Sequence, residues 1–205
     1  MNNYLITGAN AMDSKELTHI LLSRGARVIL TYRRTTSLSL DSIRALFALE
    51  LSAVPTASLE FEPCDITDQN SVNQCVRAVQ AKYGDIEHLY MIAAMSHVGN
   101  SFTQKEYSIM ANGQSYYYFL EAVKNLSPKT HVYGALTSEL AGNVKAGDIF
   151  NEESCWNPKS PYSYGKNLGG NWIKHYREST ESNLFACFGI LFKHSSTYRT
   201  TDFFI

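Results

Sequence analysis

Tyr162 and Lys166 are the two residues whose types and spacing most directly suggest chemistry. They stand four positions apart in a segment with a helical pattern, which puts both side chains on one helix face. A nearby ammonium group favours phenolate over phenol, so such a tyrosine can act as a base near neutral pH. A solvated helix face gives the same spacing, so residues upstream must decide between the two interpretations.

Two upstream motifs favour the catalytic interpretation. Thr7 and Gly8 end the first apolar run, and Thr137-Ser138-Glu139 ends a later one. A glycine after the first strand, a threonine after a later strand and then Tyr-x-x-x-Lys is the order found in short-chain dehydrogenase/reductase enzymes.

Apolar runs that alternate with helical patterns predict the elements that position these residues. We expect strands at 4–6, 28–32, 59–61, 89–94, 131–136 and 184–192, and helices at 17–22, 41–51, 68–83, 105–126 and 162–178. Strands separated by helices of this length predict a parallel sheet covered on both faces. The fold class is therefore α/β, with residues 1–205 forming one Rossmann-type, doubly wound domain that carries the catalytic residues.

The segment 7–14 stands where a dinucleotide-binding turn belongs, between the first strand and the first helix. Gly8 supplies the first glycine, which allows the tight turn. Ala11 and Ser14 stand where the second and third glycines would allow close approach of a pyrophosphate and of the helix. An ordinary strand–helix turn is the alternative.

Arg33 and Arg34 close the second strand, where enzymes that use NAD tend to carry an acidic residue. Two guanidinium groups suit a 2′-phosphate instead, which favours NADP as the cofactor. A solvated basic loop is the alternative. After the third strand, Asp65 can accept from an adenine amino group, and Asp68 is expected to cap the next helix.

Composition narrows the remaining function classes. The chain has 205 residues and a formal net charge of −1, so nothing suggests a nucleic-acid-binding surface. No apolar run is long enough for a membrane span, and no signal peptide is recognised. The four cysteines and six histidines match no metal-ligand spacing. We therefore expect reduced thiols, a cytoplasmic protein and no metal site.

Further motifs make a family resemblance specific: the chain resembles the GDP-mannose 4,6-dehydratases, which are extended short-chain dehydrogenase/reductases. The resemblance covers essentially all 205 residues and rests on Tyr32-Arg33-Arg34-Thr35-Thr36-Ser37, Asp65-Ile66-Thr67-Asp68, Ser96-His97-Val98 with Ser101-Phe102, Thr137-Ser138-Glu139-Leu140, Ser160-Pro161-Tyr162 with Lys166, and Gly189-Ile190-Leu191-Phe192-Lys193-His194. The family pattern differs from this chain at Ala11, Ser14, Met91, Ala93, Met95, Lys193, Ser195 and Tyr198.

The resemblance implies a lyase that converts GDP-mannose to GDP-4-keto-6-deoxymannose through transient oxidation by bound NADP. Thr137 would hydrogen-bond O4 of the sugar, and Tyr162 would take the O4 proton. Lys166 would lower the pKa of Tyr162 and hold the cofactor ribose. Glu139 would remove the C5 proton and protonate the leaving hydroxyl at C6, a step that a simple epimerase or reductase does not need.

The resemblance also implies two sets of binding residues. Those for the cofactor are Gly8, Asn10, Ala11, Met12, Asp13, Arg33, Arg34, Asp65, Ile66, Ala93, Ser96, Tyr162, Lys166 and His194; those for the nucleotide sugar are Ser96, Lys193 and Arg199. An apolar stretch at 115–120 suggests a buried helix, either in the core or in the interface of a homodimer or homotetramer.

Family members continue for a substantial C-terminal portion, so we expect the substrate domain to be largely absent from this chain. A fragment, a truncated gene product and a natural short form are all compatible with this length. A related epimerase or reductase, and a non-catalytic nucleotide-binding subunit, stay open as alternative functions.

Overall fold

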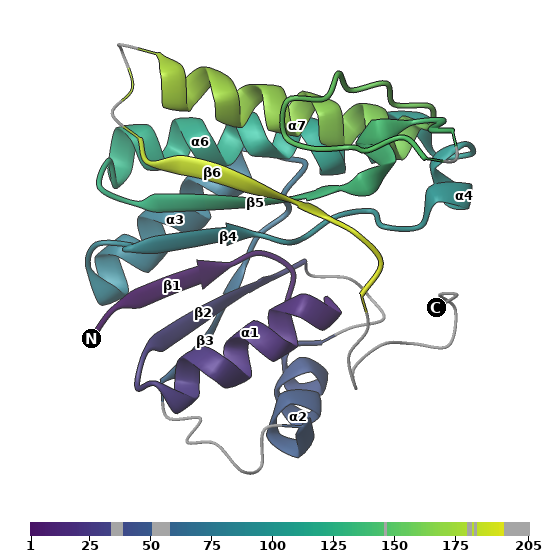
Figure 1. The fold of residues 1–205 in the computed structure, drawn as a ribbon. Helices are drawn as coiled ribbons and strands as arrows, with labels where there is room; N and C mark the ends of the chain where they lie inside the picture. Colours follow the sequence, from purple (N-terminus) through teal and green to yellow (C-terminus); the bar gives the residue numbers. More distant parts are fainter. Residues whose placement is uncertain (34–38, 51–57, 146, 180–181, 183, 195–205) are drawn as a thin grey trace.

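The computed structural model describes residues 1–33, 39–50, 58–145, 147–179, 182 and 184–194. Six strands form one sheet in the order β3-β2-β1-β4-β5-β6, and every neighbouring pair is parallel (Figure 1). The strands are β1 (Asn3–Ile6), β2 (Arg27–Tyr32), β3 (Leu59–Pro63), β4 (His88–Met91), β5 (His131–Thr137) and β6 (Ala186–Leu191). The predicted Rossmann-type sheet is confirmed.

Helices cover both faces of this sheet. On one face lie α1 (Met12–Ser23) and α2 (Leu40–Glu50), and on the other lie α3 (Gln69–Tyr83), α6 (Ser115–Leu126) and α7 (Pro161–Glu178). The two layers follow from the chain path, because right-handed crossovers that step in opposite directions from β1 place their helices on opposite faces.

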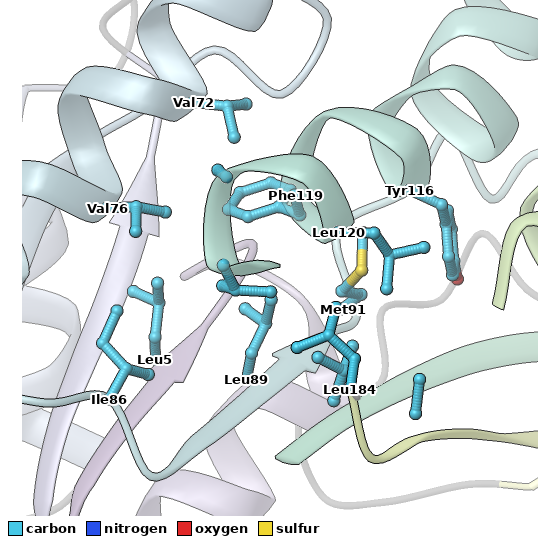
Figure 2. Close-up of a cluster of buried hydrophobic side chains, with 14 of the residues drawn as sticks. Leu5, Val72, Val76, Ile86, Leu89, Met91, Tyr116, Phe119, Leu120 and Leu184 are labelled. Atoms are coloured by element: carbon cyan, nitrogen blue, oxygen red, sulfur yellow. The ribbon is translucent and has the colours of Figure 1, made fainter. Parts of the chain in front are cut away.

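Successive side chains of a strand pack into two separate hydrophobic clusters, one on each face of the sheet. In β1, Leu5 packs into the cluster under α3, α6 and α7, whereas Ile6 packs into the cluster under α1 and α2. Figure 2 shows the first cluster, in which Val76 of α3 and Phe119 of α6 lie over Leu89 of β4. Strands buried on both faces explain why the sequence reads as continuous apolar runs.

Strand β4 ends at Met91, three residues before the expected end at 94. The backbone N–H groups of Ile92 and Ala93 donate to the Thr7 hydroxyl at 3.0 and 2.9 Å. They do so because β1 ends at Ile6 and provides no further backbone partners for strand pairing. The expected strand at 184–192 is likewise shorter, at Ala186–Leu191. Both predictions place the strand correctly but extend it too far, by three residues at the end of β4 and by two and one residues at the start and end of β6.

The long helix expected at 105–126 is three pieces. It consists of α5 (Lys105–Ile109), a π-helical turn η1 (Met110–Gln114) and α6. At Gly113 in the π turn, a Cβ would lie 2.7 Å from the carbonyl oxygen of Gly165 in α7. The wider turn therefore coincides with a close backbone approach of the two helices.

Helix ends follow their capping residues. The Asp68 carboxylate accepts from the backbone N–H of Asn70 at 2.9 Å, which confirms its predicted cap of α3. Helix α1 begins at Met12, five residues before the expected start. Its end agrees with the glycine stop, since Gly25 has a φ of +74°.

Two short helices were not predicted: α4 (Val98–Ser101) and the 3-10 turn η2 (Ser138–Ala141).

Candidate active site at the carboxyl edge of the sheet

Two adjoining cavities open along the carboxyl ends of the strands, where ligands bind in open α/β sheets. The first has a volume of about 630 Å³ and the second of about 560 Å³. They share Asn10, Ala11, Ala94 and Ser96 in their walls. Together they form one continuous cleft from β2 and β3 to β5 and β6.

The turn after β1 lies where the two cavities meet. Gly8 has a φ of +86°, and a Cβ on it would lie 3.0 Å from the Cα of Ala93, so this position requires glycine. Ala11 precedes α1 in an extended conformation and supplies no side-chain cap. The first turn of α1 therefore faces the cleft with its backbone N–H groups, an arrangement suited to phosphate.

Ser14, which replaces the third glycine of the fingerprint, is fully buried. Its hydroxyl donates to the carbonyl oxygen of Thr7 at 3.3 Å. The serine therefore joins α1 to the end of β1 and leaves the close packing of helix and strand intact.

The far end of the first cavity is lined by Arg33, Asp65 and Ile66. One oxygen of the Asp65 carboxylate accepts from the backbone N–H and the hydroxyl of Thr67, at 2.9 and 2.7 Å. These bonds fix the carboxylate at the rim. Arg34, the second predicted phosphate contact, lies outside the described residues.

The second cavity brings together the four predicted catalytic residues. Thr137 ends β5, Glu139 lies in η2 directly after it, and Tyr162 and Lys166 lie one turn apart in α7. All four line the cavity. The start of α7 is fixed by a reciprocal capping box between Ser160 and Ser163, with proline at the first helical position.

Lys166 lies at the bottom of the site and is only 2% exposed. Its ammonium group donates to the carbonyl oxygen of Ala135 at 2.6 Å and lies 3.5 Å from the hydroxyl of Tyr116. Burial lowers the pKa of Lys166 to about 8.

Tyr162 differs from the sequence expectation of a lowered pKa. Burial raises the pKa of its phenol, a hydrogen bond with Thr137 opposes this, and the nearby Glu139 charge adds to the increase. Lys166 directs its ammonium group to the Ala135 carbonyl and is not among the groups that shift this pKa. The hydrogen bond with Thr137 is therefore the contact that favours the phenolate against burial.

The segment after β6 runs towards α1 (Figure 1), and its residues 192–194 line the second cavity together with Met12 and Asp13 of α1. One ring nitrogen of His194 lies 2.8 Å from the carboxylate of Asp13, and the other lies 2.8 Å from the carbonyl oxygen of Phe192. Both His194 and Asp13 line the cavity. This contact joins residues 181 positions apart across the cleft.

Every predicted site residue within the described ranges lies in a cavity wall. The first cavity is lined by Gly8, Asn10, Ala11, Arg33, Asp65, Ile66, Ala93 and Ser96. The second adds Met12, Asp13, Thr137, Glu139, Tyr162, Lys166, Lys193 and His194. Arg199, a predicted substrate contact, lies outside the described residues.

Sequence reasoning missed three groups at this site. Tyr107 lines the first cavity, while Ala135 and Tyr116 contact Lys166. The Ala135 contact uses a backbone carbonyl, which leaves no signal in residue type. Both tyrosines lie in the expected helix at 105–126, in which only the stretch 115–120 was singled out, as apolar.

The described part of the chain has neither a candidate metal cluster nor a candidate membrane span. No group of three or more His, Cys, Asp or Glu side chains there could hold a metal ion. Over the same residues, no helix has the length and apolar character needed to span a bilayer.

Comparison with known sequences decides the family, since the sequence model of the GDP-mannose 4,6 dehydratases matches residues 5–205. The chain belongs to this family. It is 32% identical over 202 residues to GDP-mannose 4,6 dehydratase 2 of Caenorhabditis elegans and 33% identical over 207 residues to the GDP-mannose 4,6-dehydratase of Yersinia enterocolitica. These alignments cover 97% and 99% of this chain but 50% and 52% of the relatives. The chain thus spans about half the length of the relatives it matches.

Solved structures agree on the fold. The dTDP-glucose 4,6-dehydratase of Streptomyces venezuelae superposes with a TM-score of 0.70 at 21% identity, over 89% of this chain and 53% of that one. The UDP-Glc/GlcNAc 4-epimerase of Campylobacter jejuni superposes with a TM-score of 0.72 at 16% identity, over 92% and 52%. Dehydratases and epimerases therefore share this sheet, and the choice between them depends on the site.

Proposed function

We propose that residues 1–205 form the NADP-binding and catalytic domain of a GDP-mannose 4,6-dehydratase, a lyase that forms GDP-4-keto-6-deoxymannose. The observation that carries this proposal is the position of Glu139. This residue lines the same cavity as Thr137, Tyr162 and Lys166, and its backbone N–H donates to the Thr137 hydroxyl at 3.2 Å. An oxidation site and a carboxylate for elimination thus adjoin each other.

The residues of the cleft fit NADP. The glycine turn at Gly8 and the uncapped start of α1 suit a pyrophosphate, and the exposed Arg33 suits a 2′-phosphate. Ala11 has a φ of −70°, so this position does not need glycine for its backbone conformation. Lys166 and Tyr162 line the opposite end, where the nicotinamide half would lie.

When bound, NADP supplies the acceptor for the hydride from C4 of the sugar and returns that hydride to C6. The chain's own residues manage the protons. Tyr162 accepts the O4 proton, which leaves a ketone at C4. Burial raises the pKa of Tyr162, and the hydrogen bond with Thr137 partly offsets this increase by stabilising the phenolate. Lys166, with a pKa of about 8, carries positive charge at neutral pH one helical turn from Tyr162.

Glu139 performs the step that defines a dehydratase. The ketone at C4 acidifies the C5 proton, which the carboxylate removes. The same group then protonates the hydroxyl that leaves C6 as water. The proton that Tyr162 took from O4 is available for C5, which must be protonated when a hydride adds to C6. Glu139 is exposed, so it can reach a sugar bound in the open part of the cavity and exchange protons with solvent.

An epimerase or reductase is the second candidate, because the similar fold of a 4-epimerase is compatible with either chemistry. Such an enzyme uses the threonine, tyrosine and lysine but has no task for Glu139. A cytoplasmic homodimer or homotetramer completes the proposal. Half-buried aromatic side chains on α6 and α7, with the rings of Tyr117 and Trp172 4.9 Å apart, support an interface there.

The test is incubation of the chain with GDP-mannose and NADP, followed by mass spectrometry of the nucleotide sugars. We expect a product lighter by one water, and none in a reaction with UDP-glucose in place of GDP-mannose. Conversion of either sugar to an isomer of equal mass would contradict the dehydratase and favour the epimerase.

A further inference from the structure

Arg33 and Tyr107 make a direct contact across the rim of the first cavity. The Arg33 guanidinium donates to the Tyr107 hydroxyl at 3.0 Å, and its central carbon lies 5.6 Å from the centre of the tyrosine ring. Both residues line this cavity. The contact joins the end of β2 to α5, two elements 74 residues apart in sequence.

Tyr107 is held from behind by tight backbone packing. Its neighbour Ser108 is fully buried and accepts from the side-chain amide of Asn112 at 3.1 Å. At Gly165 of α7, a Cβ would lie 3.0 Å from the carbonyl oxygen of Ser108, so α5 and α7 meet with no side chain between them. The position of Tyr107 is thus set by the helix that carries the catalytic tyrosine and lysine.

Arg33 has much less to hold it. Its side chain is exposed, and an arginine in this state loses considerable rotamer freedom when it binds an anion. The contact with Tyr107 orders the guanidinium in advance and occupies one of its five N–H donors, which leaves the others for a ligand.

The tyrosine hydroxyl has a second capacity. Because its oxygen accepts from Arg33, its own proton is available to donate to another acceptor at the same place. A phosphate at this rim can therefore meet two kinds of donor, a guanidinium and a hydroxyl.

We propose that Tyr107 is a specificity-determining residue for the 2′-phosphate of NADP, which positions Arg33 and donates its own hydroxyl to the same phosphate. This inference rests on the proposed function, because it assigns a further residue to the cofactor site. It also explains why the partner of Arg33 is a tyrosine. An acidic partner would cancel the positive charge that a phosphate needs.

The test compares dissociation constants for NADP and NAD by isothermal titration calorimetry in four proteins: the unmodified chain, Tyr107→Phe, Arg33→Ala and the control Tyr118→Phe. Tyr118 is a partly buried tyrosine of α6 that lines neither cavity. Tyr107→Phe keeps the ring and removes the hydroxyl. We expect it to weaken NADP about 5- to 20-fold while the NAD constant changes less than about two-fold. Tyr118→Phe should leave the NADP-to-NAD ratio unchanged.

The outcomes separate this inference from the cofactor assignment. Loss of the NADP preference in Arg33→Ala together with an unchanged ratio in Tyr107→Phe would overturn the role of Tyr107 and leave the cofactor assignment standing. Equal constants for NADP and NAD in the unmodified chain would overturn both. A general loss of folding would weaken both nucleotides together, so the ratio distinguishes it from the specific effect.

Discussion

At the catalytic end of the cleft, α7 is locked against its neighbours, whereas at the phosphate turn α1 meets the cleft with no side-chain cap. The start of α7 has a capping box, and its glycines allow direct backbone contact: a Cβ on Gly169 would lie 2.8 Å from the ring of Tyr116. The turn before α1 depends on Gly8 and a few bonds to Thr7.

This difference matches what each end must do. Proton transfer requires groups fixed within fractions of an ångström, so the catalytic end gains from tight packing. Phosphate binding uses backbone N–H groups that must stay available, so a side-chain cap on α1 would compete with the ligand. Substitutions at the first end should therefore change chemistry or stability, and those at the second should change affinity.

The largest expected effects come from the two acid–base residues. Tyr162→Phe should slow both oxidation and water loss by about 100- to 10,000-fold, because no group then accepts the O4 proton. Glu139→Gln should slow water loss by a similar factor but leave oxidation possible, so reduced cofactor accumulates. Nicotinamide absorbance measures the first step, and mass spectrometry of the sugar measures the second.

Tyr164→Phe is the matched control, since Tyr164 lies two residues further along α7 and is exposed. It should retain the unmodified rate. Water loss at the unmodified rate in Glu139→Gln would show that this carboxylate is not the proton carrier and would bring the epimerase or reductase forward.

A bulky side chain at Gly169 should break the packing of the catalytic end. In Gly169→Leu the new Cβ would lie 2.8 Å from the Tyr116 ring and 3.1 Å from the carbonyl oxygen of Asn112. Overpacking of this kind costs roughly 1–3 kcal/mol of unfolding free energy. Urea denaturation measures the loss.

Asn171→Leu provides the comparison, because Asn171 is an exposed residue of the same helix. Its change in unfolding free energy should stay within about 0.5 kcal/mol. Equal stabilities of the two variants would mean that α7 is not packed as closely as its glycines indicate.

The catalytic end was also the more predictable from sequence. Two of its residues, Thr137 and Glu139, lie at or just after the end of a strand. The other two, Tyr162 and Lys166, share one helix face. Hydrophobic periodicity and the order of elements along the chain locate both kinds of position. The direction of the Lys166 ammonium was not predictable, because its acceptor is the backbone carbonyl of Ala135. The expected lowering of the Tyr162 pKa is wrong chiefly because burial of the phenol raises it, a tertiary effect that residue spacing does not encode.

The cofactor end was predictable in position but not in detail. Gly8 and Arg33 marked the two ends of the first cavity, yet Tyr107 enters it from a helix that the sequence merged into one long element. The π turn that separates α5 from α6 depends on packing against α7, and local propensity does not encode that contact. Strand ends shifted for a similar reason, as the amides after β4 bind the Thr7 hydroxyl.

Lys166 should give the catalytic end a distinct pH dependence. Its folded-state pKa of about 8 lies below the usual value of 10.5, so between these values the unfolded chain binds more protons and stability rises with pH. Lys166→Met has no such group. The difference in unfolding free energy, unmodified protein minus variant, should therefore increase by up to about 1.4 kcal/mol per pH unit between pH 8 and 10.

Urea denaturation of both proteins at pH 8, 9 and 10 checks this, because all other titrating groups cancel in the difference. Below pH 8 the difference should be constant. A difference that stays flat up to pH 10 would mean that Lys166 keeps an ordinary pKa and is not buried as described.

The smallest expected effect tests the phosphate turn itself. Ala11 lines both cavities and its φ of −70° does not require glycine, so the effect of glycine here would be to remove a methyl group that restricts the approach of a pyrophosphate. Ala11→Gly should tighten NADP binding about two- to five-fold by calorimetry.

Ser14→Gly should not tighten NADP binding, because Ser14 lines neither cavity and its hydroxyl instead donates to the Thr7 carbonyl. That variant should lose about 1 kcal/mol of unfolding free energy through the lost bond and the helix propensity of glycine. Tighter NADP binding in Ser14→Gly but not in Ala11→Gly would reverse these roles, and would show that the spacing of α1 from β1, and not the access of phosphate to the turn, limits affinity at this end of the cleft.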